Sequence, residues 1–294
     1  MAQRLLIPPR GHDLGGGFTV RRLLPAAAQR AVGPFVFFDH FGPVAAGPHD
    51  NHDVRPHPHI GLATVTYLYE GAMLHRDSTG AVQRIEPGAI NWMTAGRGIV
   101  HSERTPDDLR AHTRRSHGLQ LWVALPADAE EGEPGFAHTP AAAIPALEVG
   151  GAHLSVLLGQ AFGAVSPVRT ASPTLFIDAQ LSDGDAFPAP LADERALYGV
   201  DGPFVLDGEP VPAQTLVLLR PGEEPLVAAE ADVRVALVGG APLGERFVWW
   251  NFVSSRRARI EQAADDWAAG RFAAVPGETE FIPLPERPAH PPRR

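Results

Sequence analysis

Short runs in which apolar and polar residues alternate recur along most of the chain. Gly, Pro, Asp or Asn stands between most of these runs. Alternation with a period of two is typical of half-buried strands, and frequent turn residues keep such strands short. The clearest runs are FTVRRLL (18–24), ATVTYLYEG (63–71), GLQLWVALP (118–126), TLFIDAQL (174–181), QTLVLLRPG (214–222) and VRVALVGG (233–240). The pattern predicts an all-β sandwich or barrel.

One segment near the middle of the chain breaks this pattern. ADAEEGEPGFAHTPAAAIPALEVGG (127–151) lacks alternation and is rich in Ala, Pro, Glu and Gly, as linkers between domains often are. A chain of 294 residues also exceeds the size of a typical single domain. We therefore predict two β domains of similar size, at residues 1–135 and 150–294.

A single helix is predicted, over SRRARIEQAADDWAAGRF (255–272), and is assigned to the second domain. Apolar residues recur there at the spacing of a helical face, and Gly270 marks the end of the helix. The apolar stripe consists of Ile260, Ala264, Trp267 and Phe272.

Composition narrows the function classes. The formal net charge of −9 argues against a protein that binds nucleic acid through the phosphate backbone. The chain has no cysteine, so any metal must be held by His, Asp or Glu. No run approaches the 18 apolar residues of a membrane span, and the N-terminal residues lack a signal-peptide core. We expect a cytoplasmic protein without a membrane segment.

The segment RPHPHIG (55–61) places two histidines one residue apart at the start of a predicted strand. Residues i and i+2 of a strand point to the same face, so His57 and His59 share a face. Pro56 and Pro58 favour extended backbone and hold the two imidazoles in place. A single His-x-His is common in proteins without metal, so this pair alone does not establish a site.

A second pair, His101 and Glu103 in HSE (101–103), has the same spacing and follows the turn-forming TAGRG. The spacing of 42 residues from His59 to His101 allows several short hairpins, enough to bring the chain back alongside the first pair. If the two strands meet in one barrel, three imidazoles and one carboxylate converge. That donor set suits Fe, Mn, Ni, Cu or Zn.

Three blocks of the N-terminal half resemble the pirin family of the cupin superfamily. They are FVFFDHFGP (35–43), RPHPHIGLATVTYLYEGAMLHRDSTG (55–80) and NWMTAGRGIVHSE (91–103), and they agree in order and spacing. The resemblance implies two tandem cupin barrels, with one divalent metal, typically Fe(II), on His57, His59, His101 and Glu103. Many cupins carry their acid four or five residues after the second histidine; here Ala63 and Thr64 occupy those positions.

The second domain has no His-x-His motif. It therefore resembles a degenerate cupin barrel without metal ligands, whose role would be to stabilise and shield the first barrel. Since the second barrel can cover the first within one chain, we favour a monomer.

Apolar residues close to the ligand segments are candidates for a substrate pocket. Trp92 and Met93 precede the second motif and could form an apolar wall, although aromatic core packing explains them equally well. Phe41 carries the same ambiguity. The expected pocket residues are Phe41, Val54, Trp92 and Met93.

The resemblance implies a metal-dependent dioxygenase that cleaves the ring of flavonols such as quercetin. Glu103 would then be both a ligand and the general base for the 3-hydroxyl proton. The substrate could also be another small aromatic or enol. A non-enzymatic alternative is an iron-binding, redox-responsive regulator of a transcription factor or metabolic enzyme, acting through protein contacts. A cupin isomerase or small-molecule binder is a third reading.

Overall fold

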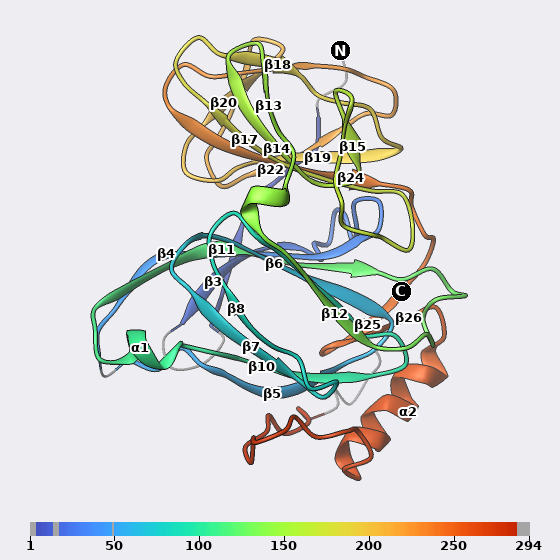
Figure 1. Cartoon of the computed structure of the whole chain (residues 1–294). Helices are drawn as coiled ribbons and strands as arrows, with labels where there is room; N and C mark the ends of the chain where they lie inside the picture. The colour runs from blue at the N-terminus through green and yellow to red at the C-terminus, as the bar shows by residue number, and fades with distance from the viewer. Residues whose placement is uncertain (1–3, 14–17, 49, 287–294) are drawn as a thin grey trace.

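The computed structural model describes residues 4–13, 18–48 and 50–286, and these form two stacked β-barrels (Figure 1). Each barrel combines a seven-stranded sheet with a four-stranded one. The prediction of an all-β fold with two tandem cupin barrels is confirmed. No helix in the described ranges is long and apolar enough to cross a membrane.

The strands of the first barrel lie between Arg10 and Thr139. Its larger sheet contains, in spatial order, β12 (Gly135–Thr139), β9 (Ile90–Thr94), β6 (Leu62–Glu70), β11 (Arg114–Ala124), β4 (Phe35–Ala46), β3 (Thr19–Leu24) and β2 (Arg10–Asp13). Its smaller sheet contains β5 (Val54–His59), β10 (Ile99–Arg104), β7 (Met73–Asp77) and β8 (Val82–Ile85). A short helix, α1 (Asp107–Arg110), follows β10.

The second barrel repeats this plan. Its larger sheet contains β1 (Leu6–Ile7), β22 (Leu216–Leu219), β19 (Glu194–Gly199), β24 (Val233–Gly240), β17 (Thr174–Leu181), β14 (Ala152–Leu158) and β13 (Ala146–Val149). Its smaller sheet contains β18 (Ala186–Pro188), β23 (Leu226–Ala228), β20 (Phe204–Leu206) and β21 (Glu209–Val211). The barrels are linked through the 3₁₀ helix η1 (Ala141–Ala143), and a small hairpin joins β15 (Gln160–Ala161) to β16 (Ala164–Val165).

Alternation along β11 shows how the sequence pattern builds this architecture. Leu119, Leu121 and Val123 are buried in the cluster that packs one large sheet against the other. Gln120 and Trp122, on the opposite face of the same strand, line a cavity inside the first barrel. One strand thus supplies both the interface between the barrels and a wall of the cavity, because its side chains alternate between two faces.

The two ends of the chain depart from the predicted domain limits of 1–135 and 150–294. β1 pairs with β22, so the N-terminal strand completes the sheet of the second barrel. The segment after the second barrel returns to the first, where Phe252 forms a bridge with Ile60. Composition marks a linker but does not show which sheet edge a terminal segment will cover. The outermost limits, 1 and 294, lie outside the described residues.

The returning segment consists of β25 (Phe247–Trp249), β26 (Phe252–Ser254) and α2 (Arg257–Ala268). In Figure 1, α2 lies against the first barrel. The predicted helix over 255–272 therefore exists with shorter bounds, and it belongs spatially to the first barrel. Its apolar face buries Ile260, Ala263 and Ala264 against Ile60 and Phe252.

Candidate metal centre

The two histidine-bearing segments are neighbouring antiparallel strands of the smaller sheet. In the register of β5 and β10, His101 lies opposite His57, and Ile99 lies opposite His59. β5 is the edge strand of this sheet, which is where prolines within a strand are tolerated, so Pro56 and Pro58 do not interrupt the ladder. The sheet thereby brings the His-x-His motif alongside the HSE motif.

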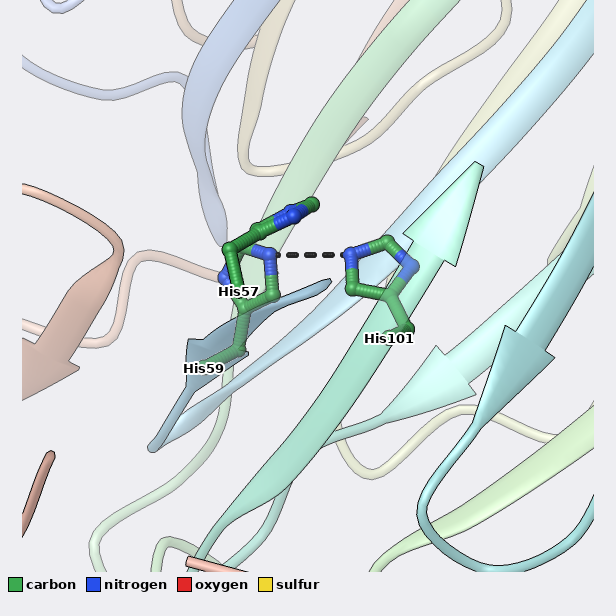
Figure 2. Close-up of side chains that lie close together, drawn as sticks. All are labelled: His57, His59 and His101. Atoms are coloured by element: carbon green, nitrogen blue, oxygen red, sulfur yellow. Dashed lines mark hydrogen bonds between the residues drawn. The ribbon is translucent and has the colours of Figure 1, made fainter. Parts of the chain in front are cut away.

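Three imidazoles converge inside the first barrel (Figure 2). Among the described residues, His57, His59 and His101 form a buried group in which one donor atom from each lies within 4.8 Å of the others. His59 Nε2 is 3.1 Å from His101 Nε2, and the ring centroids of His57 and His101 are 4.3 Å apart. A group of three nitrogen donors at this separation can hold a metal ion.

Backbone carbonyls orient two of the rings. His57 Nδ1 donates to the carbonyl of Arg55 over 2.9 Å, and His59 Nδ1 donates to that of Asn251 over 3.1 Å. A carbonyl can only accept, so each Nδ1 carries the proton and each Nε2 keeps its lone pair for a ligand. Asn251 belongs to the segment that returns from the second barrel, so the C-terminal part of the chain fixes one predicted ligand.

Burial keeps these rings neutral. It lowers the pKa of His57 to about 4 and holds the pKa values of His59 and His101 well below the usual value, with the neighbouring histidines adding to the effect. A neutral imidazole is the form that binds a metal, so the three rings are ready to coordinate at neutral pH.

Glu103 lies on the same strand, two residues after His101, but outside the tight group of nitrogens. The pairing of β10 with β5 shifts in register between His101 and Glu103, and the extra residue of this irregularity lies on β5. Glu103 is 9% exposed and lines the same cavity, and burial raises its pKa to about 7. The structure thus brings together three of the four predicted ligands and places the fourth beside them.

Two buried polar atoms in this group have no hydrogen-bond partner within the described residues: His101 Nδ1 and Glu103 Oε1. Leaving a buried polar group without a partner costs free energy, and a bound ion can supply the partner that the carboxylate lacks. Three nitrogens with a nearby carboxylate oxygen are also a donor set that divalent transition metals accept. The residues present therefore fit a divalent ion.

A cavity of about 920 Å³ opens beside the histidines, and two of the four predicted pocket residues, Phe41 and Val54, line it. The other two do not. Met93 is packed behind the cavity wall in an apolar cluster, while Trp92 borders a different, smaller cavity and donates to Thr94 Oγ1. Both are buried on β9, which belongs to the larger sheet, whereas β5 and β10 belong to the smaller one. Closeness in sequence to the HSE motif does not reveal this difference.

An aromatic wall of the cavity was not anticipated from the sequence. Phe37 and Trp122 are stacked with ring centroids 4.0 Å apart, and Trp122 meets His59 edge-on at 5.2 Å. Arg22 lies over Phe37 at 4.5 Å and forms a bidentate pair with Asp39. The alternation of apolar and polar residues along β4 and β11 shows that each strand has two distinct faces. It does not show which of these faces is directed into the barrel.

Comparison with known proteins agrees with this architecture. The pirin family model matches residues 17–123, and the model of the pirin C-terminal cupin domain matches residues 176–273. A pirin-like protein of Caulobacter vibrioides is 47% identical over 96% of this chain and 99% of its own. A Pseudomonas aeruginosa protein whose name proposes quercetin 2,3-dioxygenase activity is 38% identical over 90% of this chain and 83% of its own.

A solved structure extends the agreement to three dimensions. The crystal structure of a protein described as quercetin 2,3-dioxygenase from Acinetobacter baumannii superposes with a TM-score of 0.90 at 33% identity. The superposition covers 98% of this chain and 96% of that one. With both barrels matched along almost their full length, this chain belongs to the pirin family of two-barrel cupins.

Proposed function

We propose that this protein is a metal-dependent dioxygenase that opens the ring of a flavonol of the quercetin type. The observation that carries the proposal is the convergence of three buried, neutral imidazoles and a buried carboxylate beside a cavity with an aromatic wall. Cavities of about 300–1,000 Å³ suit small organic ligands, and this one lies within that range. The names of the Pseudomonas and Acinetobacter relatives support the same substrate class.

His57, His59, His101 and Glu103 would hold one divalent ion per chain. We propose Fe(II), with Mn, Ni, Cu and Zn as alternatives, since this donor set does not select strongly among them. When bound, the ion supplies Lewis acidity and, for a redox-active metal, the means to combine substrate with dioxygen. The protein's own contribution is to bind and orient the flavonol and to move its proton.

Glu103 is the residue proposed to take the 3-hydroxyl proton. Its carboxylate lines the cavity, is buried, and has an oxygen without a hydrogen-bond partner among the described residues. A general base of this kind must reach the proton it removes, and a carboxylate with a pKa near neutral pH is suited to the task. The aromatic wall of Phe37 and Trp122 offers a flat surface on which the planar ring can stack.

The test is turnover of quercetin by protein reconstituted with Fe(II). We expect oxygen-dependent loss of flavonol absorbance with release of carbon monoxide, and no loss under anaerobic conditions. Glu103→Gln should lower the rate by about a hundredfold or more, because general-base catalysis contributes on that order. Glu148→Gln, at an exposed site on the second barrel, serves as the matched control and should leave the rate unchanged.

Full metal loading without oxygen-dependent loss of quercetin would overturn the dioxygenase proposal. In that event the regulator that acts through a protein partner becomes the better account of the same metal centre.

A further inference from the structure

The chain passes over the outside of the metal-binding sheet after α2. We call residues 275–282 the strap; in Figure 1 this red segment runs beneath β5. The N–H of Ile282 donates to the carbonyl of Pro56 over 2.8 Å, and Trp267 Nε1 of α2 donates to the carbonyl of Ile282 over 3.0 Å. Since β5 is an edge strand, the strap covers part of its otherwise unpaired edge.

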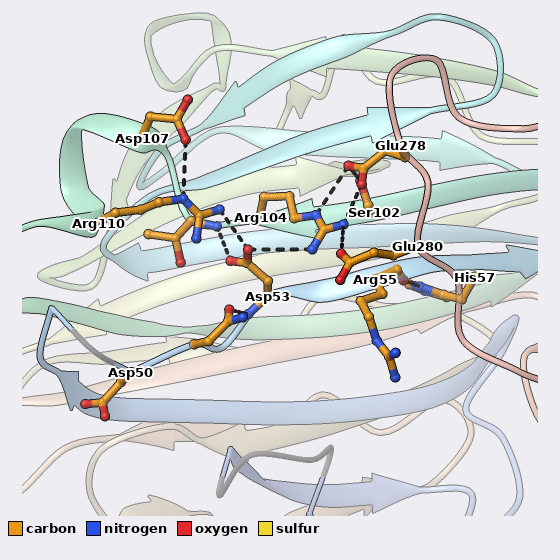
Figure 3. Close-up of polar contacts among 12 residues, drawn as sticks. Asp50, Asp53, Arg55, His57, Ser102, Arg104, Asp107, Arg110, Glu278 and Glu280 are labelled. Carbon is orange, nitrogen blue, oxygen red and sulfur yellow. Dashed lines mark hydrogen bonds and ion pairs between the residues drawn. The ribbon is translucent and has the colours of Figure 1, made fainter.

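A second attachment joins the strap to β10 (Figure 3). Ser102 Oγ donates to Glu278 Oε1 over 2.8 Å, and the Arg104 guanidinium forms an ion pair with the same carboxylate. Arg104 also contacts Glu280 over 2.8 Å. Ser102 is fully buried and Glu278 is 12% exposed, whereas Glu280 is 55% exposed at the edge of the strap.

These contacts fall on the chain neighbours of the predicted ligands. Pro56 precedes His57, and Ser102 lies between His101 and Glu103. Side chains of a strand alternate between its faces, so the ligands point into the barrel while Ser102 points outward to the strap. A shift of the strap would therefore be transmitted directly to the backbone that carries the ligands.

Arg104 extends the connection to Asp53, which directly precedes β5. Its guanidinium lies 3.7 Å from Asp53, which also pairs with Arg110 over 2.7 Å and accepts from the N–H of Thr105 over 2.7 Å. Arg104 and Ile282 both line the cavity. The strap thus covers the outside of the sheet and contributes Ile282 to the lining of the cavity.

We propose that Glu278 is a positioning residue for the metal centre: by holding Ser102 and Arg104, it locks β10 against the strap and slows the release of the bound ion. This inference rests on the proposed metal site but not on any catalytic activity. Partners that orient metal ligands typically change metal affinity by about ten- to a hundredfold when they are removed, which sets the size of the expected effect.

The experiment loads the full-length protein with Co(II), whose visible absorption reports the geometry of its ligands, and follows its removal by excess EDTA. Glu278→Gln should release Co(II) about tenfold faster than the unmodified protein and alter the Co(II) spectrum. Glu280→Gln is the matched control, since it removes a carboxylate that contacts the same arginine from an exposed position, and its release rate should stay within about twofold.

Two further variants keep the test decisive if Glu278→Gln folds poorly. Ser102→Ala removes one strap hydrogen bond, and Trp267→Phe removes the donor to Ile282 at the other attachment. Each should accelerate release by a smaller factor and raise hydrogen exchange at the Ile282 amide.

Two outcomes distinguish a failure of the proposed role of Glu278 from a failure of the proposed metal site. Co(II) that binds all variants and leaves each at the same rate, with one spectrum, overturns the role of Glu278 and leaves the metal centre standing. Failure of the unmodified protein to bind Co(II) overturns both.

Discussion

His59 Nε2 lies 3.1 Å from His101 Nε2, although 42 positions separate the two residues in the chain. Two neutral imidazoles can share such a contact only if one of them donates, and His59 is already protonated on Nδ1 toward the Asn251 carbonyl. An ion that accepts both lone pairs requires no proton between them. The contact therefore favours an ion bound between the two rings.

His101→Ala should abolish stoichiometric binding of a divalent ion, because it removes one of the three converging nitrogens. Metal content after reconstitution and dialysis, measured by elemental analysis, checks this. His153→Ala, an exposed histidine of the second barrel, is the matched control and should retain one ion per chain. An unchanged metal content in His101→Ala would show that the ion binds elsewhere.

Trp122→Leu should weaken quercetin binding by about two- to tenfold while leaving metal content unchanged. The reason is the loss of a stacking surface, which is worth about 0.5–1.5 kcal/mol beyond apolar burial. Titration under anaerobic conditions measures the affinity without turnover. Trp92→Phe, at the tryptophan that borders the other cavity, should bind quercetin normally. Equal losses in the two variants would mean that the stacked wall does not contact the substrate.

Tyr198→Phe should lower the free energy of unfolding by about 1 kcal/mol, the usual net value of one hydrogen bond. Its hydroxyl contacts His40 Nδ1 over 2.7 Å and so joins the second barrel to the first. Urea denaturation measures the change. Tyr69→Phe is a sharp control, because the buried Tyr69 hydroxyl has no partner among the described residues and its removal should cost little or nothing. Equal stability of the two variants would show that the hydrogen bond between Tyr198 and His40 does not stabilise the protein.

The difference in free energy of unfolding between the unmodified protein and the His40→Gln variant should decrease as the pH falls below about 6.5. Burial lowers the pKa of His40 to about 2, with Arg21 and His117 contributing, whereas the unfolded chain takes up the proton near 6.5. Between these values the unfolded state binds more protons, so stability is lost with falling pH, by up to about 1.4 kcal/mol per pH unit.

Denaturation of the two proteins at pH 7.5, 6 and 5 measures this difference. Taking the difference cancels the contributions of the other titrating groups, including Glu103 and Asp178, whose raised pKa values act in the opposite direction. A constant difference across this range would contradict a neutral, buried His40.

Local patterns in the sequence determined a large part of this protein. Alternation predicted the strands, and the two i, i+2 pairs predicted which imidazoles share a face, since both features depend on the geometry of a single strand. The pairing of β5 with β10 then brings His57 opposite His101, although the four strands β6 to β9 lie between them in sequence. Phe41 and Val54, close to the ligand strands, were likewise placed at the cavity.

Only the tertiary structure decided the rest. Composition could not reveal that β1 completes the second barrel or that the chain returns to place the Asn251 carbonyl on His59. Nor could it show that Trp122 faces the cavity whereas Trp92 does not. Such contacts join segments far apart in sequence, and they depend on how whole sheets pack and which edges remain to be covered. A strand's periodicity contains no information about either.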